Sequence, residues 1–322
     1  MLAARVLMEQ GVEVTALSFK SCFFSTAKAR KAAEELGINF IEVDFSDEHL
    51  NMVKNPAHGY GKNMNPCIDC HSLMLKKAKE VMERDGFDLV ATGEVLGQRP
   101  MSQNREALKM VEVTSGLVGR LLRPMSAKLM DETEAEKKGL INRRRLLDIS
   151  GRSRSPQLEL VKKYKIKEYS SPAGGCLLTD QEFSEKLLKL LEFWPDCGAG
   201  DAELLKHGRI VWLKNETSKN ILMVIGRDQK DNEQLEKLAI KNDIIMEMAE
   251  ENGPTSLLRG IGSSELEVTE REVKVPKEIK LSELKLGEEK SEEEIIKTAL
   301  MLILYYAPKV RDKKVKMIIK LI

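Results

Sequence analysis

The sequence predicts an α/β protein in two parts, a parallel sheet flanked by helices and then a smaller α+β domain. The first observation is the alternation of β-branched runs with helical patterns through the first half of the 322 residues. The second is a break in this pattern over 194–200, where a Trp-Pro pair and two glycines interrupt the helical spacing. We therefore expect domains at 1–195 and 196–322.

Each element of the first part is predicted from its own pattern. The β-branched or apolar runs predict strands over 12–19, 40–45 and 88–91. Apolar residues at helical spacing predict helices over 26–36, 72–84 and 180–191, the first of them ending at Gly37. In a parallel sheet the ligand site lies at the carboxyl ends of the strands, so we expect 18–21 and 92–98 to line it.

The second part mixes strands and helices without alternating them. Strands are predicted over 209–214 and 220–225, with a polar turn between them, and a helix over 231–239. A charged linker near 288–294 and a late helix over 295–306 follow. This order predicts an α+β domain.

Composition narrows the class of protein. Lys and Arg total 52 and Asp and Glu total 51, so an RNA surface has to come from local clusters such as Arg143, Arg144, Arg152 and Arg154. A solvated face is the simpler explanation of any one cluster alone. No apolar run is long enough for a membrane span. Five cysteines without a secretory signal favour a reducing cytoplasm, where cysteines serve metal binding or catalysis more often than disulfides.

Three cysteines are candidates for the reactive centre. Cys67 and Cys70 open a predicted helix, whose N-terminus favours thiolates, and Cys176 follows two glycines that suit a close backbone approach. The three fit a [4Fe-4S] cluster with one open iron; with His71 as a fourth ligand they fit zinc. The run Cys67 to His71 also matches the c-type haem pattern, although that requires an exported protein. Cys22 and Cys197 are expected to be ordinary buried or loop cysteines.

Three stretches resemble one enzyme family when they are taken together. Residues 91–98 (ATGEVLGQ) resemble the second nucleotide-site motif of PP-loop tRNA 4-thiouridine synthases. Residues 147–154 (LDISGRSR), after Arg123-Pro124-Met125, resemble the corresponding stretch of tRNA thiouridylases. Residues 174–179 (GGCLLT) resemble the catalytic-cysteine segment of 2-thiouridylases. The resemblance covers roughly 1–192 and implies the parallel sheet of the PP-loop ATP-pyrophosphatases.

The resemblance implies a tRNA sulfurtransferase that adenylates a uridine carbonyl with ATP and Mg²⁺ and then replaces the oxygen with sulfur. The sulfur would come from a cysteine desulfurase, a carrier protein or free sulfide. Either a cluster on Cys67, Cys70 and Cys176 carries sulfide, or Cys176 carries a persulfide that Cys67 or Cys70 resolves. A PP-loop enzyme with another substrate and a non-catalytic RNA-binding protein are the alternatives.

Strand-end position and clustering of charge predict the other site residues. The residues expected near adenine or bordering the nucleotide are Ser18, Phe19, Thr92, Gly93 and Glu94. Arg123 and Lys128 are expected to meet phosphates. The arginines expected to follow the tRNA backbone are Arg143, Arg144, Arg152 and Arg154.

The second domain is similar to the RNA-binding domain of the fibronectin-binding and ribosome-quality-control family. Residues 224–235 carry this similarity. Arg227, in a Gly-Arg turn before a helix, is placed to hold a phosphate, and a solvated arginine explains it equally well.

The family's Ser-Gly-Gly-x-Asp-Ser phosphate loop is absent from the sequence. Residues 1–5 resemble the helix that follows this loop, so the first strand, which is central in the family's sheet, is missing as well. Its loss leaves neighbouring strands without ladder partners. We expect a misplaced start codon or a shortened sequence, and we expect the chain as written to bind ATP poorly.

Overall fold

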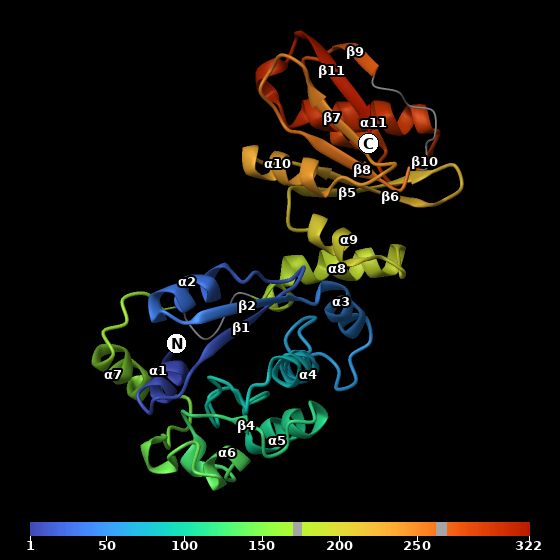
Figure 1. Ribbon diagram of the computed structural model, residues 1–322. Coiled ribbons are helices and arrows are strands. Elements are labelled where there is room, and N and C mark those ends of the chain that lie inside the picture. Colours follow the sequence, from blue (N-terminus) through green and yellow to red (C-terminus); the bar gives the residue numbers. More distant parts are fainter. Residues whose placement is uncertain (170–175, 262–268) are drawn as a thin grey trace. The chain divides into compact units, whose positions relative to one another are not determined.

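The computed structural model describes residues 1–169, 176–261 and 269–322, and the chain forms two compact units, Met1–Ser184 and Glu185–Ile322 (Figure 1). The boundary lies inside α8 (Gln181–Phe193), whereas the sequence places it after 195. The boundary falls earlier than predicted because the end of α8 packs against strands of the second unit. The Phe193 and Trp212 rings lie 4.9 Å apart, and the Trp194 indole donates a hydrogen bond to the Asn220 carbonyl at 3.1 Å.

The first unit alternates helices and strands, as the sequence predicts. Its elements are α1 (Leu2–Met8), β1 (Thr15–Lys20), α2 (Ala27–Leu36), β2 (Asn39–Asp44), α3 (Ser46–Lys54), α4 (Cys67–Asp85), β3 (Val90–Ala91), α5 (Arg105–Thr114), β4 (Leu121–Leu122), α6 (Glu134–Lys137) and α7 (Ser155–Lys163). Helix α4 begins at Cys67, five residues before the predicted start, so both cysteines of the CxxC pair lie in its first turn.

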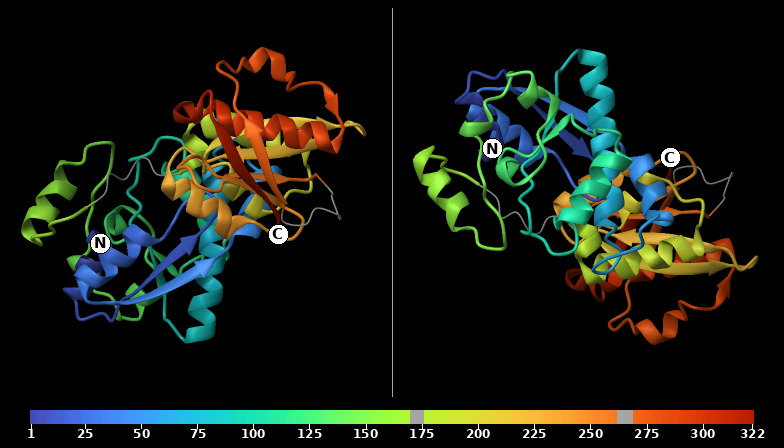
Figure 2. Two further views of the ribbon diagram at one scale, coloured as in Figure 1. Left: turned by 90° about the horizontal axis from the view of Figure 1, so that it is seen from above. Right: turned by 90° about the horizontal axis from the view of Figure 1, so that it is seen from below.

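The strands of the first unit form two separate parallel pairs (Figures 1 and 2). β1 pairs with β2 from Thr15 opposite Asn39 to Lys20 opposite Asp44, and β3 pairs with β4. Among the described residues no strand joins β1 to β3, and a cavity of about 470 Å³, which we call the β1–β3 slot, separates them. Side chains of β1, β3, α1, α2 and α4 line it.

The second unit is built on a seven-stranded sheet in the order β10-β5-β6-β8-β7-β11-β9. Its elements are α9 (Ala199–Leu204), β5 (Arg209–Asn215), β6 (Asn220–Ile225), α10 (Gln229–Leu238), β7 (Ile244–Met248), β8 (Ser256–Arg259), β9 (Thr269–Lys274), β10 (Glu289–Lys290), α11 (Glu292–Tyr305) and β11 (Lys314–Leu321). Two clusters of buried apolar side chains pack in this unit, and α11 contributes to the larger one and α10 to the smaller.

The prediction of a charged linker near 288–294 is wrong, because these residues form a short strand and the start of a helix. Glu289 and Lys290 pair with β5, and α11 begins at Glu292. Ser291 caps this helix, and its backbone N–H donates to Glu294, which completes a capping box. An acidic run at a helix N-terminus is stabilised by the helix dipole, so the charges start a helix here.

No helix in the described parts of the chain has both the length and the apolar character needed to cross a membrane.

Candidate thiol and nucleotide site

The CxxC pair occupies the first turn of α4. The Cys67 thiol donates a hydrogen bond to Asn65 Oδ1 at 2.7 Å, and Cys70 is buried. Cys176 stands immediately before a short 3₁₀ turn, Leu177–Thr179. Asn63 in the loop before α4 donates to the Thr179 carbonyl at 2.8 Å and so links the two cysteine segments. Gly174 and Gly175, whose turn the sequence predicts, lie outside the described residues.

The environment of the three thiols raises the pKa of each of them. Burial raises the pKa of the Cys70 thiol well above its ordinary value, and the charges of Cys176 and Cys67 raise it further. Burial also raises the pKa of Cys67 and of Cys176, and the Arg99 guanidinium partly offsets this rise at both thiols. The thiols are therefore neutral at rest, in contrast to the thiolates that the helix N-terminus predicts.

The described residues around the three cysteines are not arranged as a metal site. Within the described residues no three His, Cys, Asp or Glu side chains are placed to hold one metal ion. The Nδ1 of His71, the suggested fourth zinc ligand, lies 3.0 Å from Glu94 Oε1. The residues as they stand therefore do not fit a zinc ion or a cluster, and no chemical step below is assigned to either.

A buried ionic network surrounds Glu94, just after β3. Its carboxylate accepts hydrogen bonds from Thr92 Oγ1 and from Arg123 Nε, each at 3.0 Å. Burial acts to raise the pKa of Glu94, but His71 and Arg123 outweigh it and lower the pKa to about 2. Arg123 also donates to the Leu108 carbonyl at 3.0 Å, and its side chain is 1% exposed. These contacts support a structural role for Arg123, so the phosphate contact suggested by the sequence stays a prediction.

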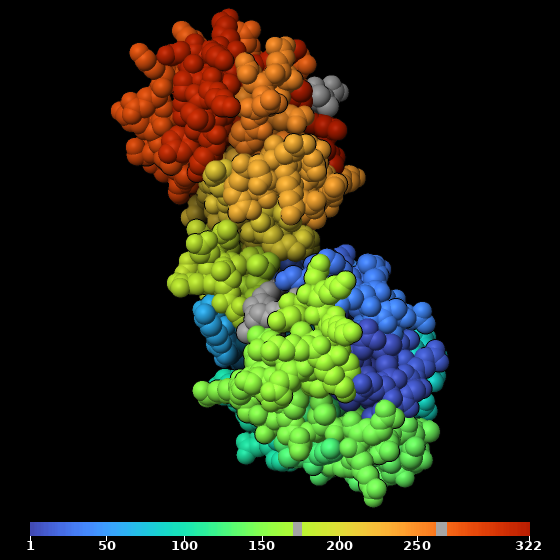
Figure 3. Space-filling model, turned by 90° about the vertical axis from the view of Figure 1, so that its left-hand side faces the viewer, coloured from blue at the N-terminus to red at the C-terminus, as the bar shows by residue number. Residues whose placement is uncertain are grey.

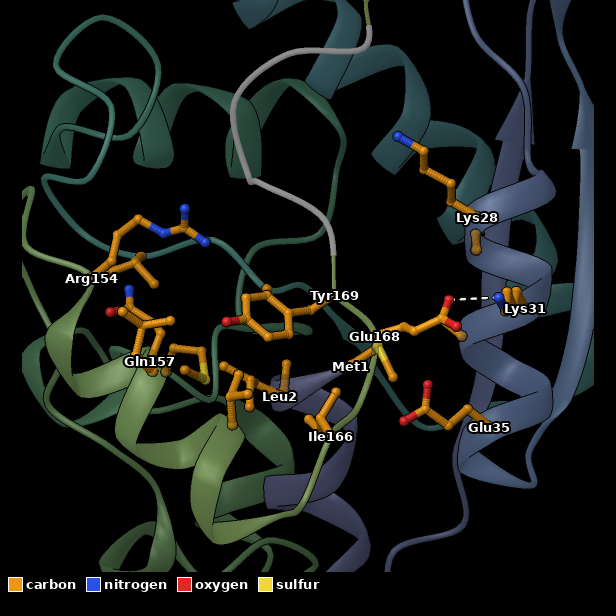
Figure 4. A pocket seen from close by; sticks show the side chains of 18 of the residues that line it. Met1, Leu2, Lys28, Lys31, Glu35, Arg154, Gln157, Ile166, Glu168 and Tyr169 are labelled. Atoms are coloured by element: carbon orange, nitrogen blue, oxygen red, sulfur yellow. Dashed lines mark ion pairs between the residues drawn. The ribbon is translucent and has the colours of Figure 1, made fainter.

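The other predicted nucleotide residues lie at strand ends of the first unit. Phe19, at the end of β1, lines the β1–β3 slot, and its ring lies 5.4 Å from that of Phe45. Gly93 lines both this slot and a second cavity of about 540 Å³, which we call the α1–α7 cavity (Figure 4). Ser18 lies beside Phe19 in β1, opposite Glu42 of β2. The strand ends thus border two adjoining cavities at Gly93.

The predicted RNA-contacting arginines differ in how much of their charge is already neutralised. Arg143 pairs with Glu136 at 2.8 Å and with Glu132 at 3.7 Å. Arg227 pairs with Asp231 at 2.6 Å, and Asp228 caps the same helix, so two carboxylates occupy the helix N-terminus where a phosphate was predicted. In contrast, no ion pair to a described residue involves any of Arg144, Arg152, Arg154 or Lys128.

Sequence reasoning missed a His–Asp pair beside the cysteines. Asp69, between Cys67 and Cys70, accepts hydrogen bonds from the backbone N–H of His58 at 2.9 Å and from its Nδ1 at 2.7 Å. The pair fixes the loop before α4 against the first turn of the helix. The spacing of eleven residues in a loop has no periodic pattern, so nothing in the sequence indicates this contact.

The strand–helix alternation defines an α/β domain whose strand ends border two cavities. A family model described as the tRNA methyl transferase HUP domain matches residues 2–114, which include Cys67, Cys70 and Glu94. Through this region the chain is related to the PP-loop tRNA thiouridylases, as the sequence motifs predict.

Curated relatives agree with this assignment. The tRNA-specific 2-thiouridylase MnmA of Geobacter metallireducens is 30% identical over 118 residues, covering 29% of this chain and 31% of the relative. The MnmA protein of Geotalea uraniireducens is 31% identical over 118 residues, covering 29% and 30%. That of Cutibacterium acnes is 39% identical over 71 residues, covering 20% and 19%. The chain thus spans less than a third of the length of the first relatives, and no solved structure matched it.

Proposed function

We propose that this chain is a tRNA sulfurtransferase that adenylates a uridine carbonyl with ATP and replaces the carbonyl oxygen with sulfur handled by Cys67, Cys70 and Cys176. The observation that supports the proposal is the hydrogen bond from Asn63, in the loop before the CxxC pair, to the Thr179 carbonyl, which links the segment of Cys176 to that pair inside a unit related to thiouridylases. An ATP-dependent reaction and a tRNA substrate follow from that relationship.

The chemistry has two stages. In the first, the uridine carbonyl oxygen attacks the α-phosphorus of ATP, and pyrophosphate leaves. In the second, the terminal sulfur of a persulfide on Cys176 attacks the activated carbon, and AMP leaves with the former carbonyl oxygen. Adenylation is needed because an unactivated carbonyl oxygen is a very poor leaving group.

A resolving thiol completes the sulfur transfer. The thiolate of Cys67 or Cys70 attacks the Cys176 sulfur, the bond between that sulfur and the transferred sulfur breaks, and the thiouridine is released as the two cysteines form a disulfide. A sulfane-sulfur donor then reloads Cys176 after a dithiol reductant has returned the disulfide to thiols. The raised pKa of all three thiols implies that a base or a bound cation generates the thiolate during the cycle.

The test has two stages, sulfur loading, which needs no ATP, and then turnover with ATP and tRNA. The full chain is incubated with a sulfane-sulfur donor, and mass spectrometry maps any added sulfur atom. We expect one extra sulfur on Cys176 and a disulfide to Cys67 or Cys70 after turnover with ATP and unmodified tRNA. Cys176→Ser should lose both products, whereas Cys197→Ser, a change to a buried cysteine of the second unit, should keep them.

Two outcomes contradict the proposal. If Cys176→Ser forms thiouridine at the rate of the unaltered protein, Cys176 does not handle sulfur. If anaerobically purified protein contains about four irons with acid-labile sulfide, and Cys176→Ala loses them, the persulfide route falls and a cluster carries the sulfide. Zinc at one atom per chain would instead indicate a structural role for Cys67 and Cys70.

A further inference from the structure

The loop 98–104, between β3 and α5, holds a large apolar side chain in water. Met101 is 76% exposed, more than any other large apolar side chain in the described parts of the chain. Single exposed apolar residues are common on protein surfaces, so exposure alone does not give Met101 a role. Its role follows from how the loop is built and from what lies beside it.

The loop is held by its own hydrogen bonds although its tip is exposed. The Gly97 N–H donates to the Gln103 carbonyl at 2.6 Å and closes the loop at its base. The Asn104 side-chain amide donates to the Pro100 carbonyl at 2.8 Å, and the same side chain caps α5. Gln103 is buried. The backbone on both sides of Met101 is therefore fixed, and its side chain is presented to solvent from a braced loop.

The base of the loop lies against the segment that carries two of the arginines predicted to contact RNA. Leu96 forms a parallel bridge with Ser150, and the Gly151 N–H donates to the Leu96 carbonyl at 2.7 Å. Arg152 and Arg154 follow, and no ion pair to a described residue involves either. Figure 3 shows the bright green segment that leads into α7 on the surface of the first unit. An RNA that meets these arginines therefore passes close to the loop.

The loop also lies near the thiols of the proposed reaction. Burial raises the pKa of Cys67 and of Cys176, and the charge of Arg99 opposes this rise at both thiols. Salt limits the reach of a surface charge to about 10 Å, so the Arg99 guanidinium stands within about that distance of both sulfur atoms. A uridine that reaches Cys176 therefore arrives beside the loop.

Charge and apolar area favour RNA over a protein as the partner of the loop. Residues 97–105 contain two arginines, Arg99 and Arg105, and no carboxylate. Arg105 donates to the Leu129 carbonyl at 3.0 Å, but no ion pair to a described residue involves it, so its charge is available to a phosphate. A stable protein interface needs an apolar core of many side chains. Nucleic-acid-binding proteins, in contrast, insert single residues such as methionine between two bases.

We infer that the loop 98–104 is a wedge that enters the base stack of the tRNA at the target uridine. Met101 fills the space that the uridine leaves when it turns toward Cys176. An enzyme that acts on a stacked base has to take it out of the stack, which exposes the flat faces of the neighbouring bases. The flexible thioether of methionine adapts to such faces. The inference rests on the proposed function, since it names the residue that takes the place of the reacting uridine.

The first experiment identifies what Met101 touches in a complex. The full chain with Met101→p-benzoylphenylalanine, a photoreactive residue, is irradiated with a pool of unmodified tRNA transcripts, and sequencing maps the adducts. We expect adducts at one site in each reactive tRNA, directly next to a uridine. Met110→p-benzoylphenylalanine, at an exposed methionine of α5, is the matched control and should give few adducts. The inference is overturned if position 101 gives no tRNA adduct, or forms adducts only with an added purified cysteine desulfurase.

The second experiment measures unstacking, which needs neither ATP nor sulfur. A transcript carries 2-aminopurine at the crosslinked nucleotide, because the fluorescence of this base rises when it loses a stacked neighbour. We expect binding to raise the fluorescence with the unaltered protein and with Met101→Leu, which keeps a large apolar side chain. Met101→Ala should abolish the rise and weaken tRNA binding about tenfold, since the apolar contact is lost. Met110→Ala should change neither quantity.

Folding and the proposed function are tested separately from the wedge. Because Met101 is exposed, Met101→Ala should leave the melting temperature unchanged, so a lost fluorescence rise is not a loss of folding. A rise that depends on Met101, without any sulfur on Cys176, would leave the wedge standing and remove the sulfurtransferase. Sulfur on Cys176 with an equal fluorescence rise in Met101→Ala and the unaltered protein would keep the sulfurtransferase and overturn the wedge.

Discussion

His49 shows how one buried side chain ties the stability of the first unit to pH. Its ring is fully buried, stacked on Phe45 at 4.7 Å, and its Nδ1 shares a hydrogen bond with Ser21 Oγ at 2.7 Å. The Nε2 has no hydrogen-bond partner among the described residues. Burial lowers the pKa of His49 to about 4, because an imidazolium in this aromatic surrounding would lose its hydration.

This shift predicts a loss of stability in mild acid. The unfolded chain takes up a proton near pH 6.5 and the folded chain only near pH 4, so stability falls as pH drops through that window. Between pH 7.5 and pH 5 we expect His49 to account for a loss of about 2 kcal/mol. His49→Gln should be less stable at pH 7.5 and should lack this part of the pH dependence.

The measurement has to report the unfolding of the first unit separately from that of the second. Both tryptophans, Trp194 and Trp212, belong to the second unit, so their fluorescence does not report on His49. Pulse alkylation of Cys22, which is buried next to Ser21, gives the urea midpoint of the region at each pH. Parallel pH profiles in the two proteins would show that His49 is not the responsible group.

At the scale of elements, the β1–β3 slot is the main departure from a complete parallel sheet. Every residue of β1 except the exposed Lys20 is only half-buried, including the apolar Ala16, Leu17 and Phe19. Strands of parallel sheets are normally buried on both faces and hydrogen-bonded on both edges. The apolar lining, with Leu17 and Val90 on its two sides, marks a place where a strand would gain burial on both of its faces.

We expect the slot to accept an added strand. A six-residue Val/Ile-rich segment joined to Met1 by a short glycine-rich turn should pair with β1 and β3 and raise the melting temperature by about 4 °C or more. Hydrogen exchange of the β1 and β3 amides should slow. The control segment carries Lys and Glu at alternate positions and should leave both quantities unchanged, because charges are not tolerated where both faces are buried. An equal gain from both segments would mean that the slot does not select a strand.

The elements were more predictable from the sequence than their side-chain contacts. Gly37 adopts the left-handed conformation that ends α2, as its position predicts, and β5 and β6 lie within one residue of their expected bounds. These features depend on local turn chemistry and periodicity. The Glu94–Arg123 and His58–Asp69 pairs join residues that are far apart in the chain and follow no spacing rule. Cys67, Cys70 and Cys176 were singled out because their residue types restrict the possible chemistry, and their role stays a prediction.

The whole molecule has almost no net charge to attract RNA. Its 52 basic and 51 acidic residues leave a net charge of +1, so any RNA affinity depends on cations that have no internal partner. The four arginines predicted to contact RNA differ in whether a carboxylate of the chain already neutralises them. Arg143 is held by Glu132 and Glu136, whereas no ion pair to a described residue involves Arg144, Arg152 or Arg154.

This difference predicts which arginines set the salt dependence of tRNA binding. Each phosphate contact contributes about 0.7–0.9 to the slope of log K against log salt concentration. Replacing Arg144, Arg152 and Arg154 together by alanine should reduce that slope by about 2–3 and weaken binding at low salt. Arg227→Ala, which removes a cation already held by Asp231, should change the slope by less than about 0.5. Filter binding of tRNA between 50 and 300 mM salt, about the range where such slopes are linear, provides the measurement.

If the Arg227 variant and the triple variant lose slope equally, the tRNA contacts are not confined to Arg144, Arg152 and Arg154 of the first unit. The second unit would then take part in binding.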